Sequence, residues 1–113
     1  MNTDEKVELA REIARRLIEL AKEMLGPNYK RSFASEFNKW CKHAEKDFGG
    51  ALEFARRMKD SSSLRKGPKG VYDTIHKTFQ AKELRGKLET LPKKELSEVL
   101  GYVKRWLVAE KHP

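Results

Sequence analysis

Apolar residues recur at steps of three and four along almost the whole chain, and this spacing restricts the fold more than any other feature of the sequence. Before Gly26, for example, the apolar stripe consists of Ala10, Ile13, Leu17, Leu20 and Met24. Steps of three and four place side chains on one face of an α-helix, whereas one face of a strand needs a step of two. The spacing therefore predicts an all-α protein.

A second stripe is aromatic and predicts the centre of the hydrophobic core. It follows a helix start near Ser32 or Ser35 and consists of Phe33, Phe37, Trp40, Ala44 and Phe48. Four large rings on one face bury much apolar surface when they pack together. Gly49 and Gly50 are expected to end or bend this helix. A short third segment follows, which forms either a separate helix or the second arm of a bent one, with three residues facing inward: Leu52, Ala55 and Met58.

Capping residues set the expected boundaries of the first helix. Its start is predicted after Asn2 or Thr3, whose side chains can accept hydrogen bonds from the unpaired N–H groups of a first turn. Its end is predicted at Gly26 and Pro27, which stand in the order typical of a helix C-terminus.

Two further helices are expected in the C-terminal half of the chain. One runs from about residue 71 to residue 89, and a step of five between Phe79 and Leu84 predicts a kink or a register shift within it. The other begins near Pro92 and carries the stripe Leu96, Val99, Leu100, Val103 and either Trp106 or Leu107. Gly101 inside this last helix has two interpretations, namely close approach by a neighbouring helix or a tolerated weak point.

The stretch SSSLRKGPKGVY, residues 61–72, interrupts the helical pattern. Serine, glycine and proline are typical connector residues, so the stretch is predicted to be a loop. A chain of 113 residues has room for one hydrophobic core. We therefore expect a single helical domain over residues 1–113. It should fold as a compact bundle of about five helices, with a basic Ser/Gly/Pro loop between the third and the fourth.

The positive charge of the chain is concentrated in one region. The whole chain carries a formal net charge of +8. Residues 1–28 hold five cations and six acids, whereas residues 56–87 hold ten cations and three acids, a local balance of +7. Cations in such excess repel one another unless a polyanion neutralises them. A cluster of this kind is typical of a nucleic-acid-binding surface.

The basic region supplies the candidate binding residues. Serine hydroxyls and glycine-exposed N–H groups of the loop can contact phosphate oxygens, and the cations around them can neutralise phosphates. The cations proposed for this role are Arg56, Arg57, Lys59, Arg65, Lys66, Lys69, Lys77, Arg85 and Lys87. Tyr72 and His76 lie one helical turn apart and could stack on bases, although an aromatic such as Tyr72 more often lies at the edge of a core. A basic loop can also be no more than solubilising surface.

No metal, cofactor or catalytic site is predicted. Cys41 and His43 point about 200° apart on a helix, so they cannot share a metal ion. The segment GPKG lacks the spacing of a P-loop, and no nucleophile, base and orienting partner stand at recognisable positions. We therefore expect a protein that is not an enzyme. A nuclease built from Lys, His and Tyr and a helix-turn-helix around Gly49 and Gly50 are less favoured alternatives.

No segment of the sequence is apolar enough to suggest membrane insertion. The N-terminus lacks an apolar signal core, and no uncharged run approaches the roughly 20 residues that cross a bilayer. Cys41 is the only cysteine, which excludes an internal disulfide. We therefore expect a cytoplasmic protein without a membrane partner.

In length, helix content and basic balance, the chain resembles the small helical subunits that line guide and target strands in CRISPR-type ribonucleoprotein effectors. The resemblance lies in overall character and assigns a role to no individual residue. It implies a non-catalytic subunit that contacts an RNA or DNA backbone, RNA in preference to DNA, beside other protein subunits. The alternative is a helical protein-interaction module or homo-oligomeric adaptor, because the first helix offers ten apolar positions between Leu9 and Leu25.

Overall fold

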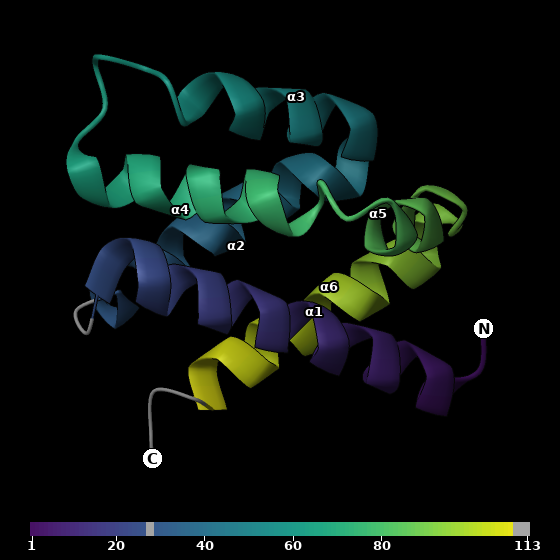
Figure 1. The fold of residues 1–113 in the computed structure, drawn as a ribbon. Helices are drawn as coiled ribbons and strands as arrows, with labels where there is room; N and C mark the ends of the chain where they lie inside the picture. The colour runs from purple at the N-terminus through teal and green to yellow at the C-terminus, as the bar shows by residue number, and fades with distance from the viewer. Residues whose placement is uncertain (27–28, 110–113) are drawn as a thin grey trace.

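The computed structural model describes residues 1–26 and 29–109, and these residues form six α-helices and no strand (Figure 1). The helices are α1 (Thr3–Leu25), α2 (Lys30–Lys46), α3 (Phe48–Met58), α4 (Lys66–Thr78), α5 (Lys82–Glu89) and α6 (Lys93–Ala109). The predicted all-α class is confirmed. The predicted count of about five helices is one too few, because the segment expected from about residue 71 to residue 89 is divided into α4 and α5.

Helix α4 lies in the middle of the bundle. It packs against α1, α2 and α3, while α6 closes the structure by packing against α1 and α2. In Figure 1, α3 and α4 run in opposite directions, and α4 lies between α3 and α1. The loop that joins α3 to α4 therefore lies at one end of the bundle, and α5 lies at the other.

The predicted aromatic stripe forms the centre of the core, although its last member, Phe48, begins α3 instead of lying on α2. All five of its predicted members are buried: Phe33, Phe37, Trp40, Ala44 and Phe48. The Trp40 ring stacks on Phe37 and on Phe79 of the α4–α5 connection, with ring centroids 5.7 and 5.6 Å apart. Aromatic pairs in this range add to the free energy gained from burial alone. Trp40 thus joins elements that are distant in the sequence.

Asn2 caps the N-terminus of α1, as predicted. Its side chain accepts a 2.8 Å hydrogen bond from the Glu5 backbone N–H, and the Glu5 carboxylate accepts one of 3.1 Å from the Asn2 backbone N–H. This reciprocal pair is a capping box, which satisfies two otherwise unpaired donors. At the other end, Gly26 ends α1 with a φ of 73°, which glycine adopts without strain, while Pro27 lies outside the described residues.

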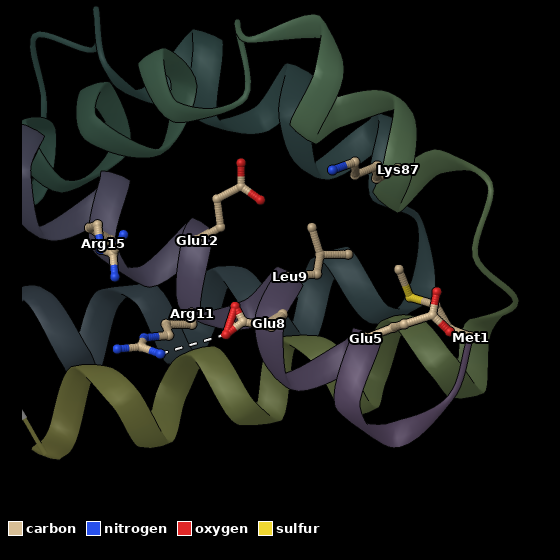
Figure 2. A pocket seen from close by; sticks show the side chains of 8 residues that line it. All are labelled: Met1, Glu5, Glu8, Leu9, Arg11, Glu12, Arg15 and Lys87. Carbon is tan, nitrogen blue, oxygen red and sulfur yellow. Dashed lines mark ion pairs between the residues drawn. The ribbon is translucent and has the colours of Figure 1, made fainter.

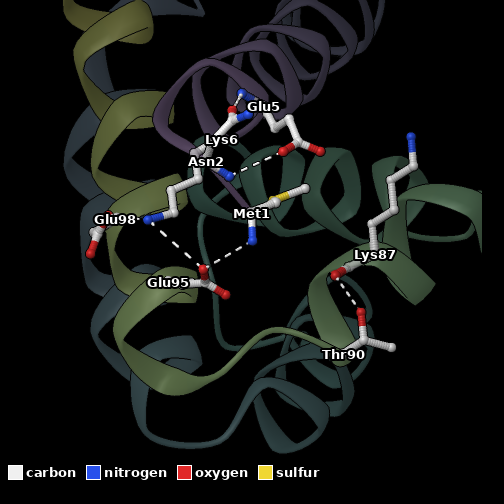
Figure 3. Close-up of polar contacts among 8 residues, drawn as sticks. All are labelled: Met1, Asn2, Glu5, Lys6, Lys87, Thr90, Glu95 and Glu98. Carbon is white, nitrogen blue, oxygen red and sulfur yellow. Dashed lines mark hydrogen bonds and ion pairs between the residues drawn. The ribbon is translucent and has the colours of Figure 1, made fainter.

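Ion pairs tie the capped end of α1 to α6 (Figure 3). The Met1 ammonium group lies 3.3 Å from Glu95, and the Lys6 ammonium group lies 2.8 Å from Glu98. The carboxylate of Glu98 raises the pKa of Lys6, and Lys6 in turn lowers the pKa of Glu98. Both shifts favour the charged forms, so the contact stabilises the packing of α1 on α6 at neutral pH.

Helices α2 and α3 are separate, and the break precedes the two glycines. Asp47 adopts an extended conformation and its carboxylate accepts a 3.1 Å hydrogen bond from the Gly50 backbone N–H. Gly49 and Gly50 therefore begin α3 instead of ending α2, because the Asp47 cap sets the new helix start. The start of α2 also differs from the prediction, at Lys30 in place of Ser32 or Ser35.

The predicted loop over residues 61–72 is shorter than expected. Helix α4 begins at Lys66, so the second half of that stretch is helical. Pro68 is tolerated in the first turn because its missing N–H would have no helical partner there. A Cβ atom on Gly70 would collide with the Leu25 side chain of α1, so the absence of a side chain allows the two helices to pack closely.

The kink or register shift predicted between Phe79 and Leu84 is a complete break. Phe79 ends α4, and Ala81 is extended before α5 begins. In α6 the apolar stripe ends with the buried Leu107, whereas Trp106 is 40 % exposed. Nothing approaches within 4 Å of a Cβ atom placed on Gly101, so close helix packing does not explain that glycine. None of the helices in the described ranges is both long and apolar enough to cross a membrane.

Candidate nucleic-acid interface

The outward face of α4 brings many of the predicted cations together. Its inward face is buried through Val71, Ile75 and their neighbours. Helical spacing places Lys66, Lys69, Asp73, His76 and Lys77 on the opposite face. Arg56 of α3 and Lys59, which directly follows α3, lie near this face, because their charges act on His76. We call the resulting patch the α4 surface, with the members Arg56, Lys59, Arg65, Lys66, Lys69, His76 and Lys77.

Half of these cations have acidic partners. Arg56 donates a 2.9 Å hydrogen bond to Glu53, and Arg57 lies 3.4 Å from the same carboxylate. Hydrogen bonding to Arg56 is the main reason that the pKa of Glu53 falls to about 2. Glu53 was missed by the charge count, which starts at residue 56. Its spacing of three and four from the two arginines was the signal that could have revealed the pairing.

Two lysines of the α4 surface are paired more loosely. Lys59 lies 3.2 Å from the neighbouring Asp60, and Lys77 lies 4.0 Å from Asp73 one turn earlier on α4. Exposed pairs of this kind contribute little to stability and are readily exchanged for other partners. These lysines therefore remain accessible to an external anion.

Arg65, Lys66 and Lys69 form the unpaired part of the surface. Within residues 1–26 and 29–109, no acidic group lies within 4.0 Å of any of these three cations. Arg65 occupies the N-cap of α4, and no side chain caps this helix end. The first-turn N–H groups and the positive end of the helix dipole therefore add to the charge of the three side chains. These three side chains and the helix end together present positive charge that an anion could neutralise.

A pocket of about 520 Å³ opens beside these cations. We call it the lysine pocket, and its lining residues are Met24, Leu25, Lys59, Leu64, Lys66, Lys69, Gly70 and Asp73. Its charged members come from α4 and from Lys59 directly after α3, whereas its apolar side chains come from the end of α1 and from the loop. The pocket thus combines a cationic side with an apolar side.

Tyr72 is part of the core and does not belong to the α4 surface. Its side chain is buried, and its ring packs edge-on against Phe54 with centroids 5.5 Å apart. The hydroxyl donates a 3.3 Å hydrogen bond to Glu36, and burial raises the pKa of Tyr72 to about 12. Because the side chain is only 5 % exposed, the Tyr72 ring is not accessible for stacking on a base in this structure.

His76, in contrast, is partly exposed. It lies 3.1 Å from the side-chain amide of Gln80. Burial and the nearby Lys59 lower its pKa, so the imidazole is mainly neutral at pH 7. Together with Arg56 and Arg85, His76 lines a smaller pocket of about 170 Å³ between α3, α4 and α5. Arg85 therefore adjoins the α4 surface, although an ion pair of 3.5 Å links it to Glu89.

Lys87 does not belong to the α4 surface. Figure 2 shows it extending from α5 toward the same space as Glu12 of α1. This pocket, of about 600 Å³, is lined by three glutamates as well as by cations. Lys87 also pairs with Glu83 at 3.5 Å. The structure therefore does not bring Lys87 together with the loop, because the break before α5 redirects the chain.

Cys41 and His43 are also separated. The Cys41 side chain is fully buried, and burial raises the pKa of its thiol to about 12. His43 is exposed and packs edge-on against Phe54. Among the described residues, no three His, Cys, Asp or Glu side chains gather into a group that could hold a metal ion.

No family profile, curated protein or solved structure matches the chain.

Proposed function

We propose that the chain binds the phosphate backbone of a nucleic acid through the α4 surface, as a non-catalytic subunit of a ribonucleoprotein assembly. The observation that carries the proposal is the position of Arg65, Lys66 and Lys69 at an uncapped helix N-terminus, where no acidic group of the described residues lies within 4.0 Å of them. The resemblance to small helical subunits of ribonucleoprotein effectors supports RNA in preference to DNA. We expect the protein in the cytoplasm, where Cys41 would remain reduced.

The charge balance supports a polyanion as ligand. Residues 53–77 hold seven cations and three acids, a local balance of +4 even when Glu53 is included. Grouped cations raise the free energy of the folded protein through mutual repulsion, and phosphates remove that cost. The recognition depends little on base sequence, because phosphate contacts carry no sequence information.

Fluorescence anisotropy with labelled strands tests this function. Single-stranded RNA, single-stranded DNA and duplex DNA are titrated with the protein over a salt series. We expect the logarithm of the affinity to fall with the logarithm of the salt concentration, with a slope of about 0.7 to 0.9 for each neutralised phosphate. RNA should bind most tightly. Absence of binding to all three ligands at low salt would refute the proposal.

A charge-reversal variant locates the interface. Replacement of Arg65, Lys66 and Lys69 by glutamate should weaken binding and flatten the salt dependence. The matched control replaces Lys42, Lys46 and Lys93 by glutamate, which changes the net charge equally at exposed positions elsewhere. Circular dichroism establishes that both variants are folded. Equal losses in the two variants would show that the α4 surface is not the binding site.

A second candidate function is self-association through α1 and α6. Trp106 and Val108 are 40 % and 50 % exposed, and Trp106 lines a groove of about 310 Å³ with Ile18. Light scattering should then detect a dimer that Trp106→Ala weakens. A strict monomer at high concentration would exclude this candidate.

A further inference from the structure

The lysine pocket has a charge balance that distinguishes between kinds of phosphate. Lys59, Lys66 and Lys69 contribute three positive charges to its lining, and Asp73 contributes the one negative charge. Lys59 pairs with Asp60 and Asp73 pairs with Lys77, so the formal charge of +2 in this lining is that of Lys66 and Lys69. A phosphodiester inside a strand carries a single negative charge, whereas a phosphomonoester carries about −1.5 to −2 at pH 7. The pocket matches the phosphomonoester better.

The apolar side of the pocket matches the group attached to such a phosphate. Met24 and Leu25 come from the last turn of α1, and Leu64 comes from the loop before α4. A flat base can pack on apolar side chains of this kind while its phosphate lies among the lysines. The volume of about 520 Å³ lies in the range usual for pockets that hold small organic ligands. There is thus room for one nucleotide.

The position of α1 favours binding of the end of a nucleic-acid strand over binding of its middle. Leu25 lies against Gly70, and both residues line the pocket, so the last turn of α1 occupies one side of it. An internal phosphate needs a path for the chain on both sides, whereas a terminal nucleotide needs only one path.

We propose that the lysine pocket binds the terminal phosphomonoester of a nucleic-acid strand. This inference rests on the proposed function and adds a preferred point of attachment to it. The continuing strand would run from the pocket along the α4 surface, past Lys77 and toward Arg56. Strand ends phosphorylated at the 5′ or at the 3′ position share the same ligand chemistry, and the experiment distinguishes them.

The test compares one RNA sequence in four forms by fluorescence anisotropy. The forms carry a 5′-phosphate, a 3′-phosphate, hydroxyl groups at both ends, or hydroxyl groups at both ends with one extra nucleotide. The last form adds the charge of one internal phosphate. We expect one phosphorylated form to bind about tenfold more tightly than the unphosphorylated strand, from added charge-assisted hydrogen bonds. The affinity of the longer strand should exceed that of the unphosphorylated strand by much less.

Two variants show whether the preference arises in the lysine pocket. Replacement of Lys66 and Lys69 by methionine removes pocket charges at similar side-chain length and should abolish the preference for the phosphorylated end. Lys77→Met is the matched control, because Lys77 lies on the same face of α4 but outside the pocket lining. It should weaken the binding of all four forms of the RNA equally and leave the ratio of their affinities unchanged.

The possible failures of the two proposals are distinguishable. If all four forms bind with equal, salt-dependent affinity, the pocket assignment is wrong and the proposed function stands. If a preference persists after replacement of Lys66 and Lys69, the pocket is also excluded. If no form binds even at low salt, both proposals are refuted.

Discussion

The indole N–H of Trp40 donates a 2.8 Å hydrogen bond to the backbone carbonyl oxygen of Ala51, and this bond joins α2 to α3 inside the core. Trp40→Phe removes the donor and leaves a small cavity. We expect the free energy of unfolding in urea to fall by about 2–4 kcal/mol. The control Trp106→Phe changes a ring that is 40 % exposed and should alter stability by about 0.5 kcal/mol or less. Similar effects of both changes would contradict the role assigned to this bond.

Two helical glycines should respond differently to alanine. Gly101 has open space around the missing side chain, so Gly101→Ala should stabilise the protein by up to about 1 kcal/mol through helix propensity. In Gly70→Ala the new methyl group meets Leu25, which must move out of its position against α4. We expect Gly70→Ala to be less stable than Gly101→Ala by about 1 kcal/mol or more. Urea unfolding measures the difference, and equal stabilities would show that the contact is unimportant.

The thiol of Cys41 should not react in the native protein. It is fully buried, and its raised pKa of about 12 leaves almost no thiolate at pH 8. With a disulfide reagent that releases a coloured thiolate, we expect no rapid reaction in native buffer and complete reaction in concentrated urea. Rapid labelling without denaturant would show that the core around α2 opens readily.

Glu53 should make stability depend on pH in the acid range. Its pKa is lowered from 4.5 to about 2, so the folded protein binds its proton less readily than the unfolded chain does. The stabilisation by Glu53 is therefore complete above about pH 5 and is lost as the pH falls toward about 2. Comparison of the wild type with Glu53→Gln by urea unfolding at several pH values should show a difference that vanishes at the acid end. A difference in stability that does not change with pH would contradict a stabilising ion pair between Glu53 and Arg56.

The same substitution should strengthen nucleic-acid binding. Glu53→Gln releases Arg56 and Arg57 from their common partner, so both can neutralise phosphates. We expect tighter binding of RNA and a salt slope steeper by up to about 0.9 for each released arginine. The control Glu19→Gln releases Arg16 on α1, away from the α4 surface, and removes the same charge. An equal gain in the control would indicate an effect of net charge alone.

Local spacing predicted the core better than it predicted the basic surface. The aromatic stripe, the Asn2 cap and the irregularity between Phe79 and Leu84 all depend on neighbours within two helical turns, and all are present in the structure, the last as a full break and not the predicted kink or register shift. Such short-range signals act in the same way in any helical protein.

The start of α4 could not be predicted in this way. Glycine and proline disfavour helices on average, yet the contact between Leu25 and Gly70 joins residues far apart in the sequence and favours a helix there. The burial of Tyr72 could not be predicted for a related reason. Its neighbours Phe54 and Glu36 come from other helices, and no spacing within the sequence reveals them.

The contact between Leu25 and Gly70 also means that the position of α4 and the charge of its outward face depend on different residues. Carbon atoms of α1 fix where α4 lies, whereas the charged side chains around the pocket contribute little to that position. Lysines and arginines on this face can therefore be exchanged, added or lost as a ligand changes, without any change in the fold. A side chain gained at position 70 would instead shift the whole face relative to α1, even though the net charge stays the same.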